Sequence, residues 1–278
     1  MLASGDRDFD DIIKKQIMIT TMNSAATPVP QIVLDRVECY DASTTDCYAF
    51  RRNTDIIDGI RLAVGNMVSG FPFDINGIHF NNSEAAYICG LFSNNNTRHL
   101  DIQSQLQANT NGLAAKRLIR RRNADCQRQD WEEFNIEWMK YVVWQKTIGN
   151  ADFPRLLTSI PLTATIIEDS TFQNGRTAEI WGTRNLRQKE LTMEFKKSRL
   201  AEGLGKCQIK RMVDAKRLGE WRQQGYFRDK NIMGKILMMC RDAVSHGVEL
   251  DIDYALLRSK EIYLGGQLLT FEQNRLAA

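Results

Sequence analysis

The chain has 278 residues, of which 43% are hydrophobic and 26% are charged, the proportions of an ordinary globular protein. Its six cysteines form no CxxC pair and its three histidines lie far apart, so neither a disulfide framework nor a metal site is expected. No run reaches the roughly 18 apolar residues of a membrane span. Because the acidic N-terminus also lacks an apolar signal core, we expect a cytoplasmic protein. We expect no metal and no cofactor.

The net charge of +3 is unevenly distributed along the chain. Residues 184–230 contain 14 Lys and Arg against 6 Asp and Glu, a net +8, which leaves −5 for the rest. A second basic stretch covers Lys116–Arg122. Such stretches are usually solvated helix faces, and the alternative is a nucleic acid bound through its phosphates. Tyr226 and Phe227, beside arginines, would suit an exposed base.

The N-terminal part of the chain predicts short extended pieces. Residues 1–45 read as an N-terminal extension that includes an extended linker at Thr27–Pro30 and a β-prone piece at Ile32–Leu34. A second β-prone piece follows at Cys47–Phe50. Between residues 73 and 80, two alternating segments flank an Asn-Gly pair, which predicts a hairpin.

The remainder of the chain predicts mostly helices, because apolar residues recur at helical spacing. The predicted helices are Ser83 (as N-cap) to Ser93, Leu100–Gln107, Leu113–Arg122, Trp131–Thr147, Phe153–Thr158, an interrupted Lys196–Glu220, Asn231–Ser245 and Tyr254–Arg258. The predicted strands are Thr163–Ile167, Val248–Ile252 and Ile262–Leu264. This balance predicts one compact, helix-rich α+β domain over residues 46–278, with a basic insert at 184–228.

Two glutamates lie where elements begin or end. Glu84 is one residue inside a predicted helix start, where the helix dipole stabilises its ionised form; the simpler alternative is that Ser83 and Glu84 only cap the helix. Glu168 ends the predicted strand from Thr163, a position that suits a site but also commonly starts a polar loop.

Two tryptophans and one helix start are further candidates. Trp131 begins an amphipathic helix and is either a core residue or a stacking surface for a base. The pair Trp181-Gly182 suits an aromatic wall beside a close backbone approach, or a buried Trp at a turn. The free N–H groups at the helix start near Asn231 and Gly234 suit a phosphate, although an ordinary amphipathic helix explains the neighbouring apolar residues.

Four pieces of sequence occur in an order that resembles the NADAR family, also called YbiA-like, of N-glycosidases acting on ribose-linked compounds. They are Asn82-Ser83-Glu84-Ala85-Ala86-Tyr87, Asp130-Trp131, Trp181-Gly182 and Asn231-Ile232-Met233-Gly234. The resemblance implies that Glu84 faces the ribose, that Glu168 is a site acid, that both tryptophans line the pocket and that the Asn231 helix holds phosphate. Asn66 resembles part of an early family segment, and Arg51 is a candidate for reaching a phosphate.

The sequence departs from the family at one acid. The family has an Asp three residues before Trp-Gly, and this chain has Ala178 there. Either Glu179 or Asp169 takes that role, or the chemistry of the chain differs from that of the family.

The resemblance implies hydrolysis of an N-glycosidic bond to ribose without a metal. Family members either hydrolyse phosphoribosyl intermediates of riboflavin synthesis or remove ADP-ribose from guanine in DNA, as antitoxins. The basic stretches favour the second activity, with single-stranded DNA held through the insert. A module that binds ADP-ribose without cleaving it is the alternative that Ala178 favours, and an accessory protein acting through protein contacts is a third.

Overall fold

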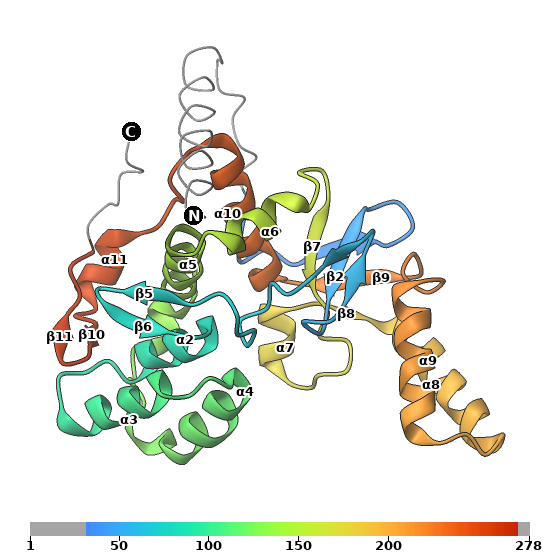
Figure 1. Cartoon of the computed structure of the whole chain (residues 1–278), viewed down its shortest axis with the longest axis horizontal. Coiled ribbons are helices and arrows are strands. Elements are labelled where there is room, and N and C mark those ends of the chain that lie inside the picture. The colour runs from blue at the N-terminus through green and yellow to red at the C-terminus, as the bar shows by residue number, and fades with distance from the viewer. Residues whose placement is uncertain (1–31, 272–278) are drawn as a thin grey trace, which may run out of the picture.

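The computed structural model describes residues 32–271, and Figure 1 shows a helix-rich body from which one helical hairpin projects. The predicted α+β class, with helices in the majority and a few short strands, is confirmed. The linker expected at Thr27–Pro30, and most of the expected N-terminal extension, lie outside the described residues. Within residues 32–271, no helix combines the length and apolar character that crossing a membrane requires.

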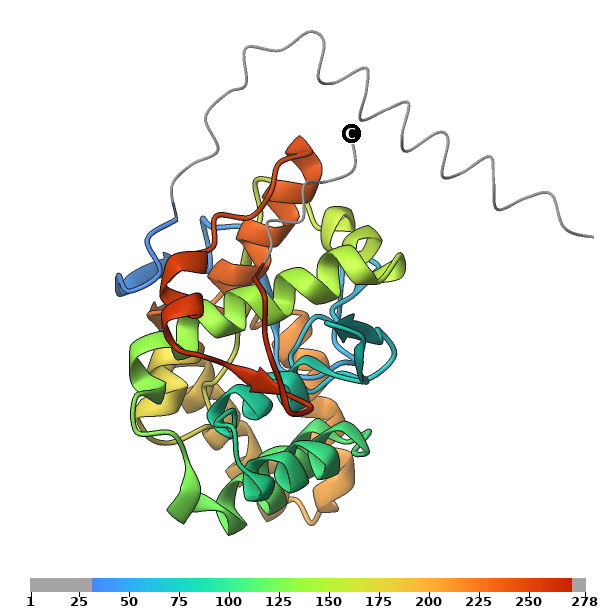
Figure 2. The ribbon, with the colours of Figure 1, turned by 90° about the vertical axis from the view of Figure 1, so that its left-hand side faces the viewer.

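Three helices form the centre of the body: α2 (Ser83–Leu91), α5 (Trp131–Gly149) and α10 (Ile232–His246). Figure 2 shows α5 from the side, and both α2 and α10 pack against it. Every residue of α2 is buried, because small residues let it approach α5 closely. At Gly90 a β carbon would lie 2.3 Å from the indole nitrogen of Trp138, so only glycine fits there.

Two small sheets frame one side of this centre. Strand β2 (Cys47–Phe50) pairs in parallel with β7 (Thr165–Glu168), and Phe50 lies opposite Glu168. Strand β9 (Tyr226–Asp229) lies between β1 (Glu38–Asp41) and β8 (Arg184–Asn185), antiparallel to both. Helix α10 packs directly on β7, so the end of this strand is held between a helix and a neighbouring strand.

The basic insert is an antiparallel helical hairpin of α8 (Leu186–Ala201) and α9 (Lys206–Leu218). Its ends are joined through β8 and β9, and it projects to the right of Figure 1. The hairpin has a small core of its own, made by Ile209, Val213 and Trp221.

The other elements are short and complete the body around the central helices. They are β3 (Ile56–Ile57), β4 (Ile60–Arg61), β5 (Phe73–Ile75), β6 (Ile78–Phe80), α3 (Thr97–Gln107), α4 (Gly112–Ala114), the π-helix η1 (Ala115–Arg120), the 3₁₀ helix η2 (Ala124–Cys126), α6 (Asp152–Ser159), α7 (Arg176–Trp181), α11 (Tyr254–Ser259), β10 (Tyr263–Leu264) and β11 (Gln267–Leu268). The hairpin expected between residues 73 and 80 is confirmed as β5 and β6.

Several local predictions are wrong for identifiable reasons. Ser83 is not the N-cap of α2, because the side chain of Asn82 accepts a hydrogen bond from the Ala85 N–H at 2.9 Å. The stretch Leu113–Arg122 is not one α-helix, since a π-helix takes up most of it. The interrupted helix expected from Lys196 begins at Leu186 instead, and Gly203 and Gly205 separate α8 from α9.

Two expected strands and one expected exposed ring are also wrong. Neither Ile32–Leu34 nor Val248–Ile252 forms a strand; Leu250 and Ile252 alternate into the core without pairing with another strand. In β9, side chains alternate between two faces, so Tyr226 is exposed whereas Phe227 is 1% exposed and unable to stack on a base.

Replacing Gly90 by Ala should destabilise the fold by about 1–3 kcal/mol, because overpacking against Trp138 outweighs the gain in helix propensity. The control is Gly149→Ala, where the added carbon would lie 3.6 Å from Phe73, an ordinary contact. Urea denaturation of both variants measures the difference. Equal midpoints for the two variants would contradict the close packing of α2 on α5.

Candidate functional site

Glu84 is positioned by the first turn of α2. The Asn82 side chain caps the helix, and the Glu84 N–H donates to the carbonyl oxygen of Asn66 at 3.0 Å. The residue is 5% exposed, so its carboxyl is almost withdrawn from water. The helix start therefore places Glu84 inside the body and brings Asn66, a predicted site residue, beside it.

Glu168 is held at the end of β7 by hydrogen bonds to its backbone. Its N–H donates to Oδ1 of Asn231 at 3.1 Å, and its carbonyl oxygen accepts from the Thr183 N–H at 2.8 Å. The Asn231 amide also donates to the carbonyl oxygen of Ile166 at 2.9 Å. The backbone of Glu168 is thus fixed on both sides, while no hydrogen bond from residues 32–271 engages its carboxyl group.

The two carboxyl groups and a lysine form one electrostatic cluster. Burial raises the pKa of Glu84, and the nearby cations of Lys116 and Arg120 oppose this rise. Burial, together with repulsion by Glu84 and Asp169, raises the pKa of Glu168 to about 7, and Lys116 opposes it. Although Glu168 is only half-buried as a residue, its carboxyl lies in low-dielectric surroundings.

The cluster has polar groups that the protein does not use itself. Within residues 32–271, neither the Glu84 nor the Glu168 carboxylate accepts a hydrogen bond. Three buried atoms near Glu84 also have no partner in this part of the chain: Oδ1 of Asn66, Nδ2 of Asn82 and Oγ of Ser83. Because buried polar atoms are nearly always paired, these atoms indicate a place where water or a ligand binds.

An aromatic group lies next to the cluster. Tyr87, one helical turn after Glu84, has its ring 4.9 Å from that of Trp131 and 5.5 Å from that of Trp181. Trp131 is buried and Trp181 is half-buried. Tyr87 thus contacts both predicted tryptophans, one helical turn from Glu84.

Two further predicted site residues, Gly182 and Gly234, lie where only glycine fits, and Gly234 lies against Asn231. A β carbon at Gly182 would lie 2.7 Å from the Glu168 carbonyl oxygen, and one at Gly234 would lie 2.2 Å from that of Ile166. Lys235, buried, donates to the carbonyl oxygens of Val33 and Arg36. The protein's own groups therefore surround the start of α10, where the sequence suggested a phosphate.

The two acids that could replace the family's Asp, whose place Ala178 takes, both form ion pairs with arginines. Asp169 is buried and paired with Arg51 at 2.6 Å. Glu179 is exposed and paired with Arg184 at 2.9 Å. Among the described residues, Glu168 is the acid whose pKa Glu84 raises. Arg51 is paired with the next residue, Asp169.

Lys116 and Arg120 are the residues that the sequence did not single out. Both lie on η1, four residues apart, and both act on Glu84. The basic run Lys116–Arg122 was visible in the sequence, but a π-helix has no distinct pattern. Its wider turn recurs at functional sites, where it redirects side chains.

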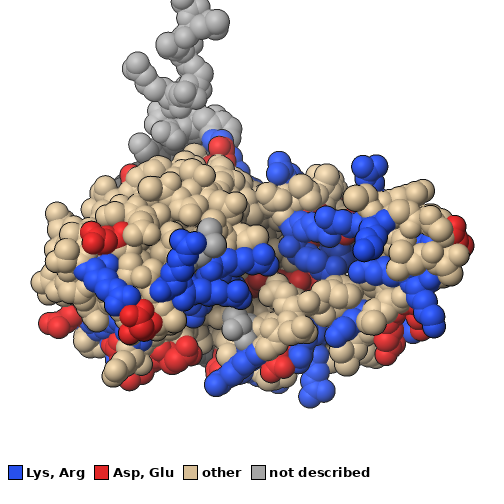
Figure 3. All heavy atoms as spheres, turned by 90° about the horizontal axis from the view of Figure 1, so that it is seen from below, with Lys and Arg blue, Asp and Glu red and all other residues tan. Residues whose placement is uncertain are grey.

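The lower face of the molecule is hollowed and basic. Figure 3 shows Lys and Arg side chains on both sides of a hollow in the lower face, with acidic atoms inside it. A separate cavity of about 240 Å³ is lined by polar residues of 94–97 together with Gln103 and Tyr263, away from both glutamates. No group of His, Cys, Asp and Glu suited to a metal ion occurs among the described residues.

Comparison with known proteins gives a remote structural likeness. No protein-family model and no curated protein matches the chain. Among solved structures, it is similar to the NMR structure of the E. coli protein YbiA, with 17% identity over 55% of this chain and 79% of that chain, and a TM-score of 0.38. Similarity at that level does not establish a shared activity.

The raised pKa of Glu168 predicts that the free energy of unfolding depends on pH. Because its pKa is about 7 in the fold and 4.5 ordinarily, the folded state holds the proton more tightly than the unfolded state. The wild-type free energy of unfolding should fall as pH rises from 4.5 to 7. Glu168→Gln should remove about 1–3 kcal/mol of that fall. Urea denaturation at pH 5 and pH 8 measures it, and identical pH dependence in both proteins would contradict the cluster.

Proposed function

We propose that the chain is a hydrolase that cleaves an N-glycosidic bond to ribose without a metal. The observation that carries this proposal is the pair of desolvated carboxyls, Glu84 and Glu168, which repel each other, share Lys116 and accept no hydrogen bond from the described chain. Glycoside hydrolysis uses two carboxyl groups in different protonation states, one as acid and one as base. A coupled pair with raised pKa values supplies both states near neutral pH.

The surroundings of each acid suggest its role. Glu84 lies near two cations, Lys116 and Arg120, so it keeps its negative charge more readily. Glu168 lies near two other acids and has a pKa of about 7, so a large fraction of it carries a proton at neutral pH. Glu84 then takes a proton from water and stabilises the developing oxocarbenium ion, while the water oxygen bonds to the anomeric carbon. Glu168 protonates the departing nitrogen as the glycosidic bond breaks.

The groups around the acids suit a nucleotide. Trp181, which is half-buried, offers an aromatic face against which a base can stack, and a contact of this kind is typically worth ~1–3 kcal/mol. Arg120 offers a guanidinium that can bind a phosphate through two hydrogen bonds. The unpaired atoms of Asn66 and Ser83 can hold ribose hydroxyls or the attacking water.

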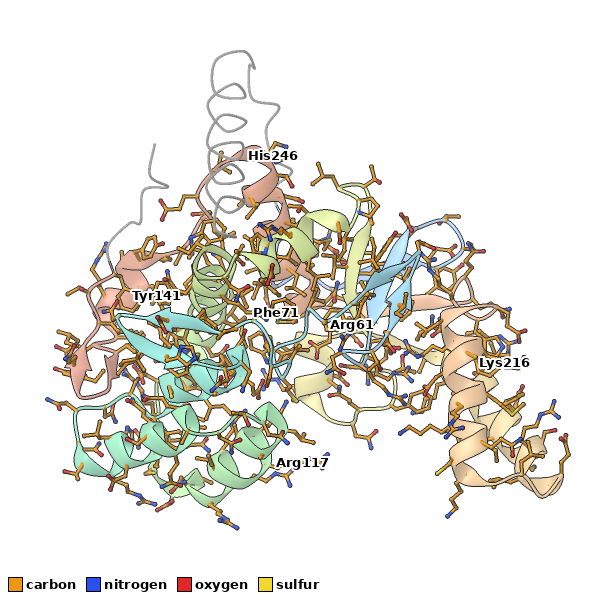
Figure 4. The ribbon with its side chains drawn as sticks, in the orientation of Figure 1. Arg61, Phe71, Arg117, Tyr141, Lys216 and His246 are labelled. Carbon is orange, nitrogen blue, oxygen red and sulfur yellow. The ribbon has the colours of Figure 1, made fainter. Side chains whose placement is uncertain are left out.

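We further propose that the substrate is ADP-ribose attached to guanine in single-stranded DNA. Two basic regions support this choice: η1 and the hairpin α8–α9. Figure 4 shows Arg117 at the lower edge of the molecule, near η1, and Lys216 on α9, far to the right in that view. Both regions contribute to a lower face rich in Lys and Arg, on which a strand could be held through its phosphates (Figure 3).

Glu84→Gln should lower turnover by about 10²–10⁴-fold while leaving the fold intact, because the amide cannot accept a proton from water. Glu168→Gln should have an effect of similar size. Glu179→Gln, at an exposed acid paired with Arg184, is the matched control and should retain activity. The assay incubates each protein with a guanine-ADP-ribosylated single-stranded oligonucleotide and follows the loss of the ADP-ribose mass by mass spectrometry.

The other outcomes identify the alternatives. Cleavage of phosphoribosyl intermediates of riboflavin synthesis but not of the oligonucleotide would keep the hydrolase and change its substrate. Binding of the modified oligonucleotide without cleavage would make the chain a reader of ADP-ribose. Equal loss of activity in Glu179→Gln and Glu84→Gln would contradict the assignment of the two acids.

A further inference from the structure

An exposed aromatic ring lies on the loop that follows Glu168. Phe172 is 38% exposed and comes four residues after Glu168, the last residue of β7. It occupies the third position of a β-turn, because the Gln173 N–H donates to the carbonyl oxygen of Ser170 at 2.8 Å. The turn therefore holds the ring at the surface, beside the segment that carries one acid of the cluster.

The turn is fixed at its base by hydrogen bonds. The Ser170 N–H donates to the Thr183 carbonyl oxygen at 2.8 Å, and the Thr171 N–H donates to Oδ1 of Asp169 at 3.0 Å. Oγ1 of Thr171 also accepts from the Asn185 N–H at 3.0 Å. Ser170 and Thr171 are each 1% exposed, so the exposed ring stands on a buried base. A ring that is already held in place loses little conformational freedom when a ligand packs on it.

Two cations from distant parts of the chain lie beside the ring of Phe172. The guanidinium carbon of Arg51, just after β2, is 4.8 Å from the ring centre, and the Lys196 ammonium of α8 is 5.3 Å from it. Arg51 is paired with Asp169 and its side chain is 17% exposed, so it contacts the ring from the protein side. Lys196 is exposed and forms no ion pair within residues 32–271, so its ammonium group can move to an arriving anion.

An exposed ring with a free lysine beside it suits single-stranded nucleic acid. The face of a base packs on an aromatic ring and the adjoining phosphate pairs with a cation, the combination by which proteins bind single strands. In a duplex the bases stack on one another, so a surface ring cannot reach their faces. Both the ring and the lysine are thus matched by one chemical class of ligand.

We propose that Phe172 stacks on the base next to the modified guanine, with Lys196 on the adjoining phosphate. This rests on the proposed function, in which Glu168 protonates the departing nitrogen of the guanine. The DNA strand then lies on the Glu168 side of the site, and the ADP-ribose lies on the Glu84 side. Four residues span at most ~14 Å of chain, so Phe172 lies on the side of the leaving strand.

Fluorescence anisotropy with a short, unmodified, labelled single-stranded oligonucleotide tests the stack. Phe172→Leu should raise the dissociation constant roughly 5–50-fold, because leucine keeps an apolar side chain but has no planar face. Phe172→Tyr keeps the ring and should stay within about threefold of wild type. The control Leu162→Ala, at a residue 53% exposed on the loop before β7, should bind as wild type does.

Salt dependence and a duplex separate the ring from the lysine. Lys196→Gln should reduce the slope of log Kd against log salt concentration by about 0.7, the value for one phosphate contact to a single strand, whereas Phe172→Leu should leave the slope unchanged. The same sequence as a duplex should bind more weakly and equally to wild type and Phe172→Leu. A duplex bound as tightly as the single strand, or wild-type affinity of Phe172→Leu for the single strand, would overturn the proposal.

The binding experiment and the hydrolase assay can fail independently, because unmodified DNA requires no turnover. A chain that cleaves none of the tested substrates but binds the single strand through Phe172 loses the proposed hydrolysis and keeps the stacking residue. A chain that hydrolyses phosphoribosyl intermediates but does not bind the single strand keeps the hydrolysis and loses the stacking residue.

Discussion

The end of β7 depends on the side chain of Asn231. Its amide makes two hydrogen bonds to the strand, at Ile166 and Glu168, as the backbone of a neighbouring strand would. The residue has a φ of 52°, a left-handed conformation that Asn adopts more readily than most residues. Gly234 then lets α10 lie against the Ile166 carbonyl oxygen. The side-chain amide of Asn231 and the lack of a side chain at Gly234 therefore hold α10, β7 and Glu168 together.

This framework holds in place the cluster of Glu84, Glu168 and Lys116, which is electrostatically unfavourable in the chain alone. Glu84 and Glu168 are both desolvated and repel each other, and Lys116 only partly compensates. Their carboxylates also lack hydrogen bonds from the described residues, next to the unpaired Oγ of Ser83. Folding tolerates such a cluster only where other contacts outweigh it, and clusters of this kind mark sites where a ligand supplies the missing interactions.

Local sequence patterns predicted the parts of this fold that local forces determine. The long helix α5, the helix α10 and the hairpin at Asn76 follow from apolar spacing and turn chemistry, and the structure confirms them. The cap of α2 was misassigned by one residue, because Asn82 and Ser83 are both good caps and only packing decides between them.

The candidate site depended on partners distant in sequence, which local patterns do not reveal. Trp131 and Trp181 were visible as motifs, but Tyr87, which joins them, has the pattern of a core residue. Lys116, which acts on both acids, lies on η1, a π-helix that local patterns do not predict. Asn231 has the sequence pattern of a phosphate ligand, yet the β7 backbone occupies its amide.

The hairpin α8–α9 shows how an insertion can be joined to this site without disturbing it. Its two ends meet as paired strands, with Arg184 opposite Arg228, so the body closes as if the insert were absent. Two buried ion pairs attach it: Arg217 with Asp55, and Arg217 more distantly with Asp169, at 2.6 and 3.9 Å. Because Asp169 directly follows Glu168, the attachment of the insert ends one residue from an acid of the cluster. The attachment of the hairpin and the acid cluster therefore share the segment Glu168-Asp169.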